Sequence, residues 1–290
     1  MISAALVKEL REITAAGMMD CKRALVETKG NMEEAVTWLR EKGIMKAAKK
    51  ESRIAAEGVC AYAIAGNKAV VYEVNAETDF VAKNQKFLDL VSEIGNAILK
   101  SDAKNDEEAL EAKTAEGTVK DLVIAATATI GEKISLRRIN VFTKTDNQVF
   151  GAYSHMGGKI VALSVLDGNN AEVAKDVCMH VAAMSPKYLD RSKVDADFLA
   201  SETEILRQET LNEGKPENIV DKIVVGKVQK MLKTICLVDQ MFVKNQDITV
   251  GQYVKDNKSN IVTYIRLEVG EGIEKRKDDF VAEVMAAVNN

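Results

Sequence analysis

Histidine and tryptophan are scarce in this sequence. Two histidines, His155 and His180, and one tryptophan, Trp38, occur in 290 residues. Histidine is the side chain that most readily gains or loses a proton near neutral pH, so its scarcity limits what the chain could catalyse by proton transfer. We therefore expect a protein that is not an enzyme of covalent chemistry.

Paired cysteines are also absent. The four cysteines stand singly, and no C-x-x-C pair is present to indicate a structural zinc or a redox dithiol. Isolated cysteines are most often buried in a protein core. We expect reduced, mostly buried thiols at Cys21, Cys60, Cys178 and Cys236.

One cysteine lies close to a histidine in the sequence, but the spacing is wrong for a nucleophile. Cys178 and His180 fall in a predicted helix, where side chains at i and i+2 point to different faces. The pattern favours a buried thiol and a partly buried imidazole in a core helix. His155 falls in a predicted turn, and we expect it to be exposed.

The chain lacks both a large net charge and a long apolar run. Acidic and basic residues number 44 and 40 and give a net charge of -4, so no global field would attract nucleic acid or an anionic membrane. The longest apolar runs, such as Leu122–Ile130, are far shorter than the roughly 20 residues of a membrane-spanning helix. The first residues resemble neither an export nor an import signal. We expect a soluble, cytoplasmic protein with no direct contact with nucleic acid or membrane.

Nucleotide-binding motifs are incomplete. Gly158-Lys159, Gly214-Lys215 and Gly226-Lys227 lack the preceding glycine and the following hydroxyl of a P-loop. Gly270-x-Gly272 follows a predicted strand, but position 275 is lysine, so the dinucleotide fingerprint is not met. We expect the chain to hold no nucleotide, and we predict no other cofactor and no metal.

The N-terminal segment has the pattern of a small helical bundle. Apolar residues recur at spacings of three and four in Ala4–Thr14, Asp20–Thr28 and Asn31–Glu41, which predicts three short helices. Their predicted buried positions are Leu6, Leu10, Ile13, Leu25, Ala35, Val36 and Leu39.

A charged stretch, Lys42–Arg53, follows the bundle and is predicted to be a helical linker. Its basic residues could touch ribosomal RNA, or they could form a solvated helix face balanced by nearby glutamates. No aromatic residues are interleaved to stack on bases, which favours the solvated face.

The rest of the chain predicts two related α+β halves, each with a small sheet covered by helices on one face. In the first half, Gly66-Asn67 separates two strands as in a tight hairpin, and a helix follows. The same order recurs in the second half after a turn at Gly157-Gly158. The predicted elements are strands Val59–Ile64, Lys68–Val74 and Ile134–Phe142 with helix Asn84–Leu99, then strands Phe150–Tyr153, Lys159–Val165 and Ile261–Val269 with helix Ala171–Ala183.

Two further helical segments are predicted. Val194–Leu232 has apolar residues at helical intervals and is broken by Gly214-Lys215-Pro216, which indicates a helical hairpin. Its apolar stripe could pair two chains into a homodimer or pack entirely on its own core, and both alternatives stay open. A last amphipathic helix is predicted over Asp278–Val288.

The segment Glu77–Asn84 connects a predicted strand to a predicted helix and carries an aromatic residue, Phe80. Connecting segments lie on the surface and often carry function. From the residues alone we favour a structural role, in which Phe80 folds back as a hydrophobic staple while Thr78 or Asp79 caps the helix. The alternative is that Phe80 is a contact residue.

Three motifs together span nearly the whole chain: Leu6–Arg11 with Gly17–Lys22, Thr78–Asn84, and Arg266–Glu274. They resemble the motifs of the elongation factor Ts family. Leu267 stands where the family often has an aromatic residue, and Met241 where a proline is usual. Thr14–Gly17 also departs from the usual Thr-Gly-Ala-Gly.

The resemblance implies an α+β fold in six parts. These are a ubiquitin-associated-like (UBA-like) three-helix bundle (1–43), a linker helix (44–57), a core N-subdomain (58–146), a core C-subdomain (147–193 and 234–274), an inserted helical hairpin with a potential role in dimerisation (194–233) and a C-terminal helix (275–290). Both core subdomains would contain small antiparallel sheets.

The resemblance also implies a function: non-covalent guanine nucleotide exchange on elongation factor Tu, the GTPase that carries aminoacyl-tRNA during protein biosynthesis. Asp79 and Phe80 would enter the GTPase domain beside its Mg²⁺ and phosphate site, so that Phe80 is a wedge rather than a staple. The implied partner-binding residues are Thr78, Asp79, Phe80, Val81, Ile130, His155, Arg11, Met18 and Met19.

Two other functions are alternatives to this one. The N-terminal bundle could recognise a ubiquitin-like or other helical partner, with the remainder serving as a scaffold. Alternatively, Cys178 or Cys60 could be the nucleophile of an enzyme. Neither alternative accounts for the full set of motifs.

Overall fold

The computed structural model describes residues 2–14 and 16–274 and shows an α+β protein. The chain forms two compact units. The first contains the described residues of Met1–Ala65, Val70–Val141 and Leu267–Asn290, and the second contains Gly66–Ala69 and Phe142–Arg266. The predicted helix Asp278–Val288 lies outside the described residues.

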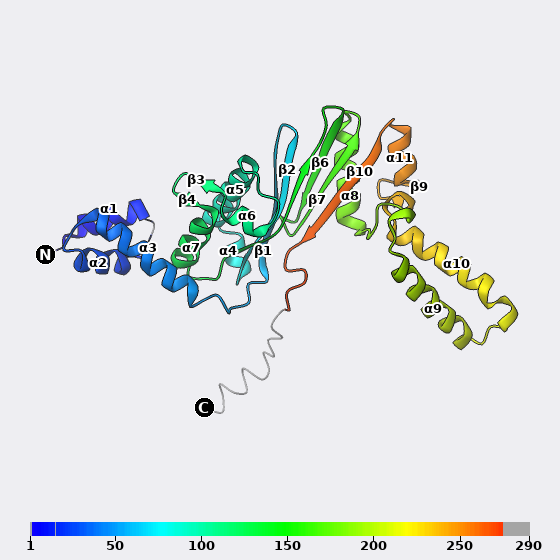
Figure 1. Ribbon diagram of the computed structural model, residues 1–290, viewed down its shortest axis with the longest axis horizontal. Coiled ribbons are helices and arrows are strands. Elements are labelled where there is room, and N and C mark those ends of the chain that lie inside the picture. Colours follow the sequence, from blue (N-terminus) through cyan, green and yellow to red (C-terminus); the bar gives the residue numbers. More distant parts are fainter. Residues whose placement is uncertain (1, 15, 275–290) are drawn as a thin grey trace, which may run out of the picture. The chain divides into compact units, whose positions relative to one another are not determined.

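The first unit begins with three helices, α1 (Ala4–Thr14), α2 (Met18–Glu27) and α3 (Met32–Ala48), coloured blue in Figure 1. Their core includes Leu10 and Leu25, which are fully buried as predicted. Asn31 begins α3 by accepting a hydrogen bond from the Glu34 amide.

The predicted end of α3 at Glu41 was wrong, because the helix continues through Gly43 to Ala48. Gly43 faces α7 (Val119–Ile130), and a Cβ atom added to Gly43 would lie 3.4 Å from the Cβ of Ala128. The glycine therefore serves close helix packing rather than a helix end. Only the first part of the predicted linker helix is helical, since residues 49–53 form turns and a bend.

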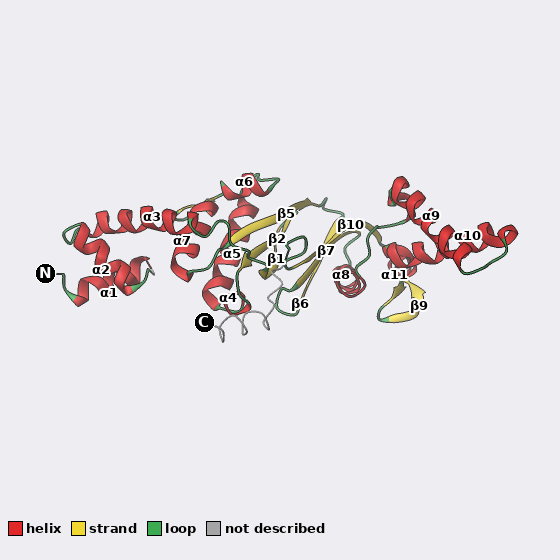
Figure 2. Cartoon of the chain, turned by 90° about the horizontal axis from the view of Figure 1, so that it is seen from below, coloured by secondary structure: helices red, strands yellow, loops and turns green. Residues whose placement is uncertain are grey.

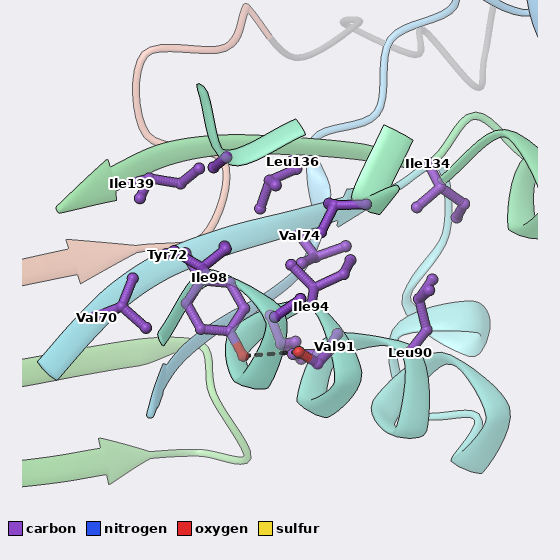
Figure 3. Close-up of a cluster of buried hydrophobic side chains, with 14 of the residues drawn as sticks. Val70, Tyr72, Val74, Leu90, Val91, Ile94, Ile98, Ile134, Leu136 and Ile139 are labelled. Atoms are coloured by element: carbon purple, nitrogen blue, oxygen red, sulfur yellow. Dashed lines mark hydrogen bonds between the residues drawn. The ribbon is translucent and has the colours of Figure 1, made fainter. Parts of the chain in front are cut away.

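The first sheet has the order β1 (Glu57–Ala65), β2 (Lys68–Ala76), β5 (Ser135–Thr143), and α5 (Gln85–Lys100) packs against it. Tyr72 lies against α5 and donates a hydrogen bond of 2.7 Å to the Val91 carbonyl oxygen (Figure 3). A Cβ at Gly95 would lie 2.2 Å from the Tyr72 hydroxyl, so only glycine fits there. These contacts confirm the predicted hairpin, helix and third strand of the first half.

Between α5 and α7 lie short elements that the sequence did not predict. They are α6 (Asp106–Leu110), β3 (Lys113–Thr114) and β4 (Gly117–Thr118), of which the two strands pair antiparallel. Thr118 and Asp121 form a reciprocal capping box that begins α7.

Glu73, next to Tyr72 on β2, is fully buried within a polar network of the first unit. Its carboxylate accepts hydrogen bonds of 2.7 Å from Nε of both Arg137 and Arg138, from Asn75 and from the Gly270 amide. Burial by itself raises the pKa of Glu73. The hydrogen bonds from Gly270, Asn75 and Arg137, together with the charge of Arg138, outweigh burial and hold that pKa below its usual value.

The second unit contains the second three-stranded sheet, with the order β10 (Asn260–Glu268), β7 (Ile160–Asp167), β6 (Gln148–His155). β6 and β7 pair antiparallel, from Gln148 opposite Asp167 to His155 opposite Ile160. Helix α8 (Ala171–Met184) packs on both strands. The repeated pattern of strands and helix that the sequence predicted is therefore confirmed.

Helices α9 (Ala196–Asn212) and α10 (Glu217–Ile235) form the predicted hairpin (Figures 1 and 2). Its turn contains Gly214 at a φ of 73°, and an ion pair of 2.7 Å joins Lys227 to Glu213. The remaining elements are two 3₁₀ turns (Arg191–Lys193 and Leu237–Asp239), β8 (Met241–Phe242), β9 (Asn245–Thr249) and α11 (Val250–Asp256). No helix among the described residues is both long and apolar enough to cross a membrane.

Candidate functional site

The segment after β2 forms a single helical turn, α4 (Asp79–Ala82). Thr78 begins the turn, and its hydroxyl accepts a hydrogen bond of 3.4 Å from the Val81 amide. Asp79 forms an ion pair of 2.6 Å with Lys83, one turn along. Thr78 therefore caps α4 and not the longer helix α5 that we expected it to cap, which begins at Asn84.

Phe80 projects from α4 into solvent with 83% of its surface exposed. The structural role that we favoured from the residues, a staple folded onto the following helix, was wrong. On the same turn Ala82 is buried in the core of the first unit, and Val81 packs partly against that core. Because these neighbours fill the inward positions, the turn presents Phe80 outward.

Glu132, which the sequence did not single out, holds the start of α4. Its carboxylate accepts hydrogen bonds of 3.0 Å from the amides of both Glu77 and Thr78, and one of 2.7 Å from the Thr78 hydroxyl. In return the Glu77 carboxylate accepts a bond of 2.6 Å from the Lys133 amide and lies 3.2 Å from Arg53. Glu132 is 54 residues from Thr78 in the sequence, and no local signal points to this contact.

Ile130 is the last residue of α7, two positions before Glu132. It is half-buried and packs against the core of the first unit. Gly131 ends the helix in the left-handed conformation, with a φ of 88°, and its carbonyl oxygen accepts a bond of 2.6 Å from Lys50. Of the predicted site residues, Ile130 is thus linked to Thr78 through the turn that carries Glu132.

The N-terminal helices expose the predicted contact residues Arg11, Met18 and Met19. The exposed fractions are 48% for Met18 and 65% for Met19, high values for apolar side chains at the start of a helix. Ile13 is 61% exposed as well, so the prediction that it is buried was wrong. Its position after Arg11 and before Met18 adds a fourth residue to this exposed group.

A groove of about 990 Å³ in the first unit runs between the N-terminal helices and α7. Ile13 and Gly17 line one side, and Leu122 and Ala125 line the other. Asp20 lies at this groove and forms ion pairs with Arg23 and Lys46. Apolar and charged side chains therefore line the groove together.

His155 lies in the second unit as the last residue of β6 and is exposed, as predicted. Its Nδ1 lies 3.3 Å from the Tyr153 hydroxyl. The next residue, Met156, has a φ of 50° and is 73% exposed. Two adjacent residues, a histidine at the end of β6 and a methionine in the turn that follows, are therefore both exposed.

The other histidine and the cysteines are structural. His180 was predicted to be partly buried but is fully buried, 2.9 Å from the amide oxygen of Gln240. Cys178 donates a hydrogen bond of 3.3 Å to Ser164. Burial raises the pKa of both Cys60 and Cys178 to about 12, which keeps these thiols protonated and unreactive.

In the part of the chain that the structure describes, no group of three or more His, Cys, Asp and Glu side chains could hold a metal ion. Phe80, Met18 and Met19 are apolar side chains that are exposed on their helices. Exposed apolar side chains of this kind are typical of surfaces that bind a partner.

Comparison with known proteins agrees with these motifs. A family model described as "Elongation factor TS" matches residues 77–271. "Elongation factor Ts" of Acholeplasma laidlawii is 54% identical over 293 residues, which cover 99% of both chains. That of Lactiplantibacillus plantarum is 54% identical over 289 residues, covering 100% of this chain and 99% of the relative. This chain belongs to the elongation factor Ts family of translation elongation factors.

Proposed function

We propose that this protein binds elongation factor Tu in its GDP form and promotes GDP release, so that GTP can replace it. The observation that carries the proposal is the 83% exposure of Phe80 on a turn held by Thr78 and Glu132. An exposed aromatic residue on an anchored turn has a small entropic cost of ordering when it enters a partner.

Exchange of this kind needs differential binding rather than proton transfer. If the protein binds the nucleotide-free GTPase more tightly than the GDP form, it must weaken GDP binding by the same factor. Burial of an aromatic side chain of roughly 150–250 Å² at about 25 cal/mol per Å² contributes about 4–6 kcal/mol before ordering costs. That free energy offsets part of the binding free energy that is lost when GDP and Mg²⁺ give up their contacts.

Phe80 and Asp79 act, in this proposal, beside the Mg²⁺ and phosphate site of the GTPase domain. Mg²⁺ in P-loop GTPases joins phosphate oxygens to protein ligands, so a small backbone shift that misplaces those ligands loosens the diphosphate. Asp79 contributes its charge from the first turn of α4. Val81 and Thr78 hold the turn in place.

The remaining predicted residues supply affinity. Arg11, Met18 and Met19 grip a helix of the GTPase domain, and methionine suits this task because its side chain adapts to the partner surface. The exposed Ile13 beside them extends this apolar surface. Ile130 and His155 add contacts from the two core subdomains.

We further assign the six segments of the chain to the family's parts: a UBA-like bundle (1–43), a linker (44–57), core subdomains (58–146; 147–193 with 234–274), a hairpin insertion (194–233) and a C-terminal helix (275–290). The three helices α1, α2 and α3 and the two three-stranded sheets support this division. The cytoplasm, where translation takes place, is the proposed location, with no cofactor and no direct contact with nucleic acid or membrane.

The test is release of fluorescent GDP from purified elongation factor Tu at fixed Mg²⁺, with catalytic amounts of this protein or of Phe80→Ala. We expect the wild type to accelerate release strongly. Phe80→Ala should raise the activation free energy of the stimulated release by at least about 3 kcal/mol, which lowers its rate more than a hundredfold. Its thermal stability should stay near that of the wild type, because Phe80 is already in water. The proposal would be contradicted if Phe80→Ala lowered the free energy of unfolding by as much as it raised the activation free energy of GDP release.

A further inference from the structure

We infer that Glu132 is the positioning residue for Phe80: its carboxylate sets the orientation in which α4 presents the aromatic ring. This inference rests on the proposed function of Phe80. Glu132 itself lies in the turn after α7 and is only partly exposed.

The geometry is that of a reciprocal clamp between two turns. Glu132 accepts from two successive amides, Glu77 and Thr78, and from the Thr78 hydroxyl. Glu77 accepts from the Lys133 amide. Each turn therefore contributes a carboxylate that binds the backbone of the other turn, which restrains both the position and the rotation of residues 77–78.

The clamp is strong because each hydrogen bond to a carboxylate is charge-assisted. It acts directly on α4, since Thr78 uses the same hydroxyl oxygen to donate to Glu132 and to accept from the Val81 amide. A four-residue helix cannot hold its own geometry in water, so its orientation comes from such external contacts. Phe80 adds no packing of its own at 83% exposure.

A second layer of contacts ties the clamp to the segment before β1. Arg53 lies 3.2 Å from the Glu77 carboxylate, and Lys50 donates to the Gly131 carbonyl oxygen at 2.6 Å. Lys133 donates to the Glu51 carbonyl oxygen. Contacts from the segment that follows α3 therefore restrain the two turns of the clamp, so that they do not move together relative to that segment.

Glu132→Gln tests the inference with little change in shape. The amide keeps one acceptor oxygen but turns an NH₂ group toward donors, so residues 77–78 lose their restraint. We expect the maximal rate of GDP release at saturating variant to fall about tenfold. The concentration for half-maximal effect should change little, because other contacts supply the affinity. Hydrogen exchange at the Glu77 and Thr78 amides should become faster.

Glu108→Gln is the matched control. Glu108 also accepts a backbone amide, that of Lys104 at 2.8 Å, but it serves the start of α6. This variant should keep the full maximal rate. A purely structural role of Glu132 would instead lower the melting temperature and leave the rate per folded molecule unchanged, and that result would overturn the inference.

The double variant Phe80→Ala/Glu132→Gln separates the two proposals. If Glu132 acts through Phe80, the double variant loses no more activity than Phe80→Ala alone. If the two losses multiply, or if Glu132→Gln alone keeps the full rate while Phe80→Ala does not, positioning by Glu132 is wrong and the wedge proposal stands. If Phe80→Ala keeps the full rate, the wedge proposal is wrong, and the role of Glu132 falls with it.

Discussion

At the scale of single residues, His180 has both ring nitrogens in use inside the second unit. The Val243 amide donates to Nδ1 at 3.3 Å, which leaves the proton on Nε2 to be donated to Gln240 at 2.9 Å. A second proton on Nδ1 would displace the Val243 amide. Burial lowers the pKa of His180 from 6.5, and the hydrogen bond to Gln240 opposes burial only partly.

The free energy of unfolding should therefore depend on pH through His180. Since its folded-state pKa is below the unfolded value of about 6.5, its contribution is complete above that pH and is lost as pH falls from there toward the folded-state pKa. Urea unfolding between about pH 5 and 8 should show this slope in the wild type and lose it in His180→Gln. His155→Gln, which changes an exposed imidazole, should keep the slope; an identical effect of both variants would contradict the assignment.

Phe80 and Glu132 show what a local pattern leaves undecided. The motif around Phe80 identified the segment, but its two alternatives, staple and contact residue, differ only in where the ring packs. That choice depends on Val81 and Ala82 filling the inward positions. Glu132 carried no local signal, because its partners are more than 50 residues away.

At the scale of elements, two glycines in helix or strand have opposite roles. A Cβ at Gly151 on β6 would lie 2.2 Å from the backbone of Ala174 on α8, so the helix could not approach the strand as it does. A Cβ at Gly226 within α10 would meet nothing within 4 Å. One glycine allows close packing, and the other only weakens a helix.

Alanine at these two positions should change stability in opposite directions. Gly151→Ala should destabilise the protein by about 1–3 kcal/mol, since α8 must shift to make room. Gly226→Ala should stabilise it by about 0.5–1 kcal/mol through helix propensity. Urea unfolding measures the free energy of unfolding of both variants. If both variants were destabilised, the expectation that a Cβ at position 226 meets open space would be wrong.

Elements with strong periodicity were predictable, whereas short ones were not. The bounds of α1 and the hairpin around Gly66-Asn67 agree with the sequence because local spacing and turn residues are sufficient to specify them. The elements α4, α6 and β3 are too short to show a period. The end of α3 was mispredicted since Gly43 was interpreted as a stop signal rather than as a packing position.

At the scale of the whole molecule, Glu73 joins three distant segments of the first unit. It binds Arg137 and Arg138 from β5 and the Gly270 amide just after β10. A carboxylate that is fully buried is costly unless each of its partners is present. Removal of the carboxylate takes a charge partner from each of two arginines, of which Arg138 keeps its ion pair of 2.8 Å with Glu271.

Glu73→Ala should therefore lower the free energy of unfolding by about 3–5 kcal/mol. Glu93→Ala, which changes an exposed glutamate on α5, should stay within about 0.5 kcal/mol of the wild type. Denaturant unfolding of both variants at neutral pH tests this. Because the folded-state pKa of Glu73 is depressed, its contribution is present above the unfolded value of about 4.3 and is lost as pH falls below it. A loss equal to that of Glu93→Ala would show that the network adds no stability.

The sequence by itself determined the α+β class, the order of the long helices and strands, the repeated sheet and the motifs of the elongation factor Ts family. These features depend on residue spacing and on turn residues, which act locally along the chain. Only the tertiary structure decided that Phe80 faces solvent, that Ile13 is exposed, and that Glu132 and Glu73 bind segments distant in sequence. Those outcomes depend on which side chains fill the space around a residue, and that space exists only once the chain has folded.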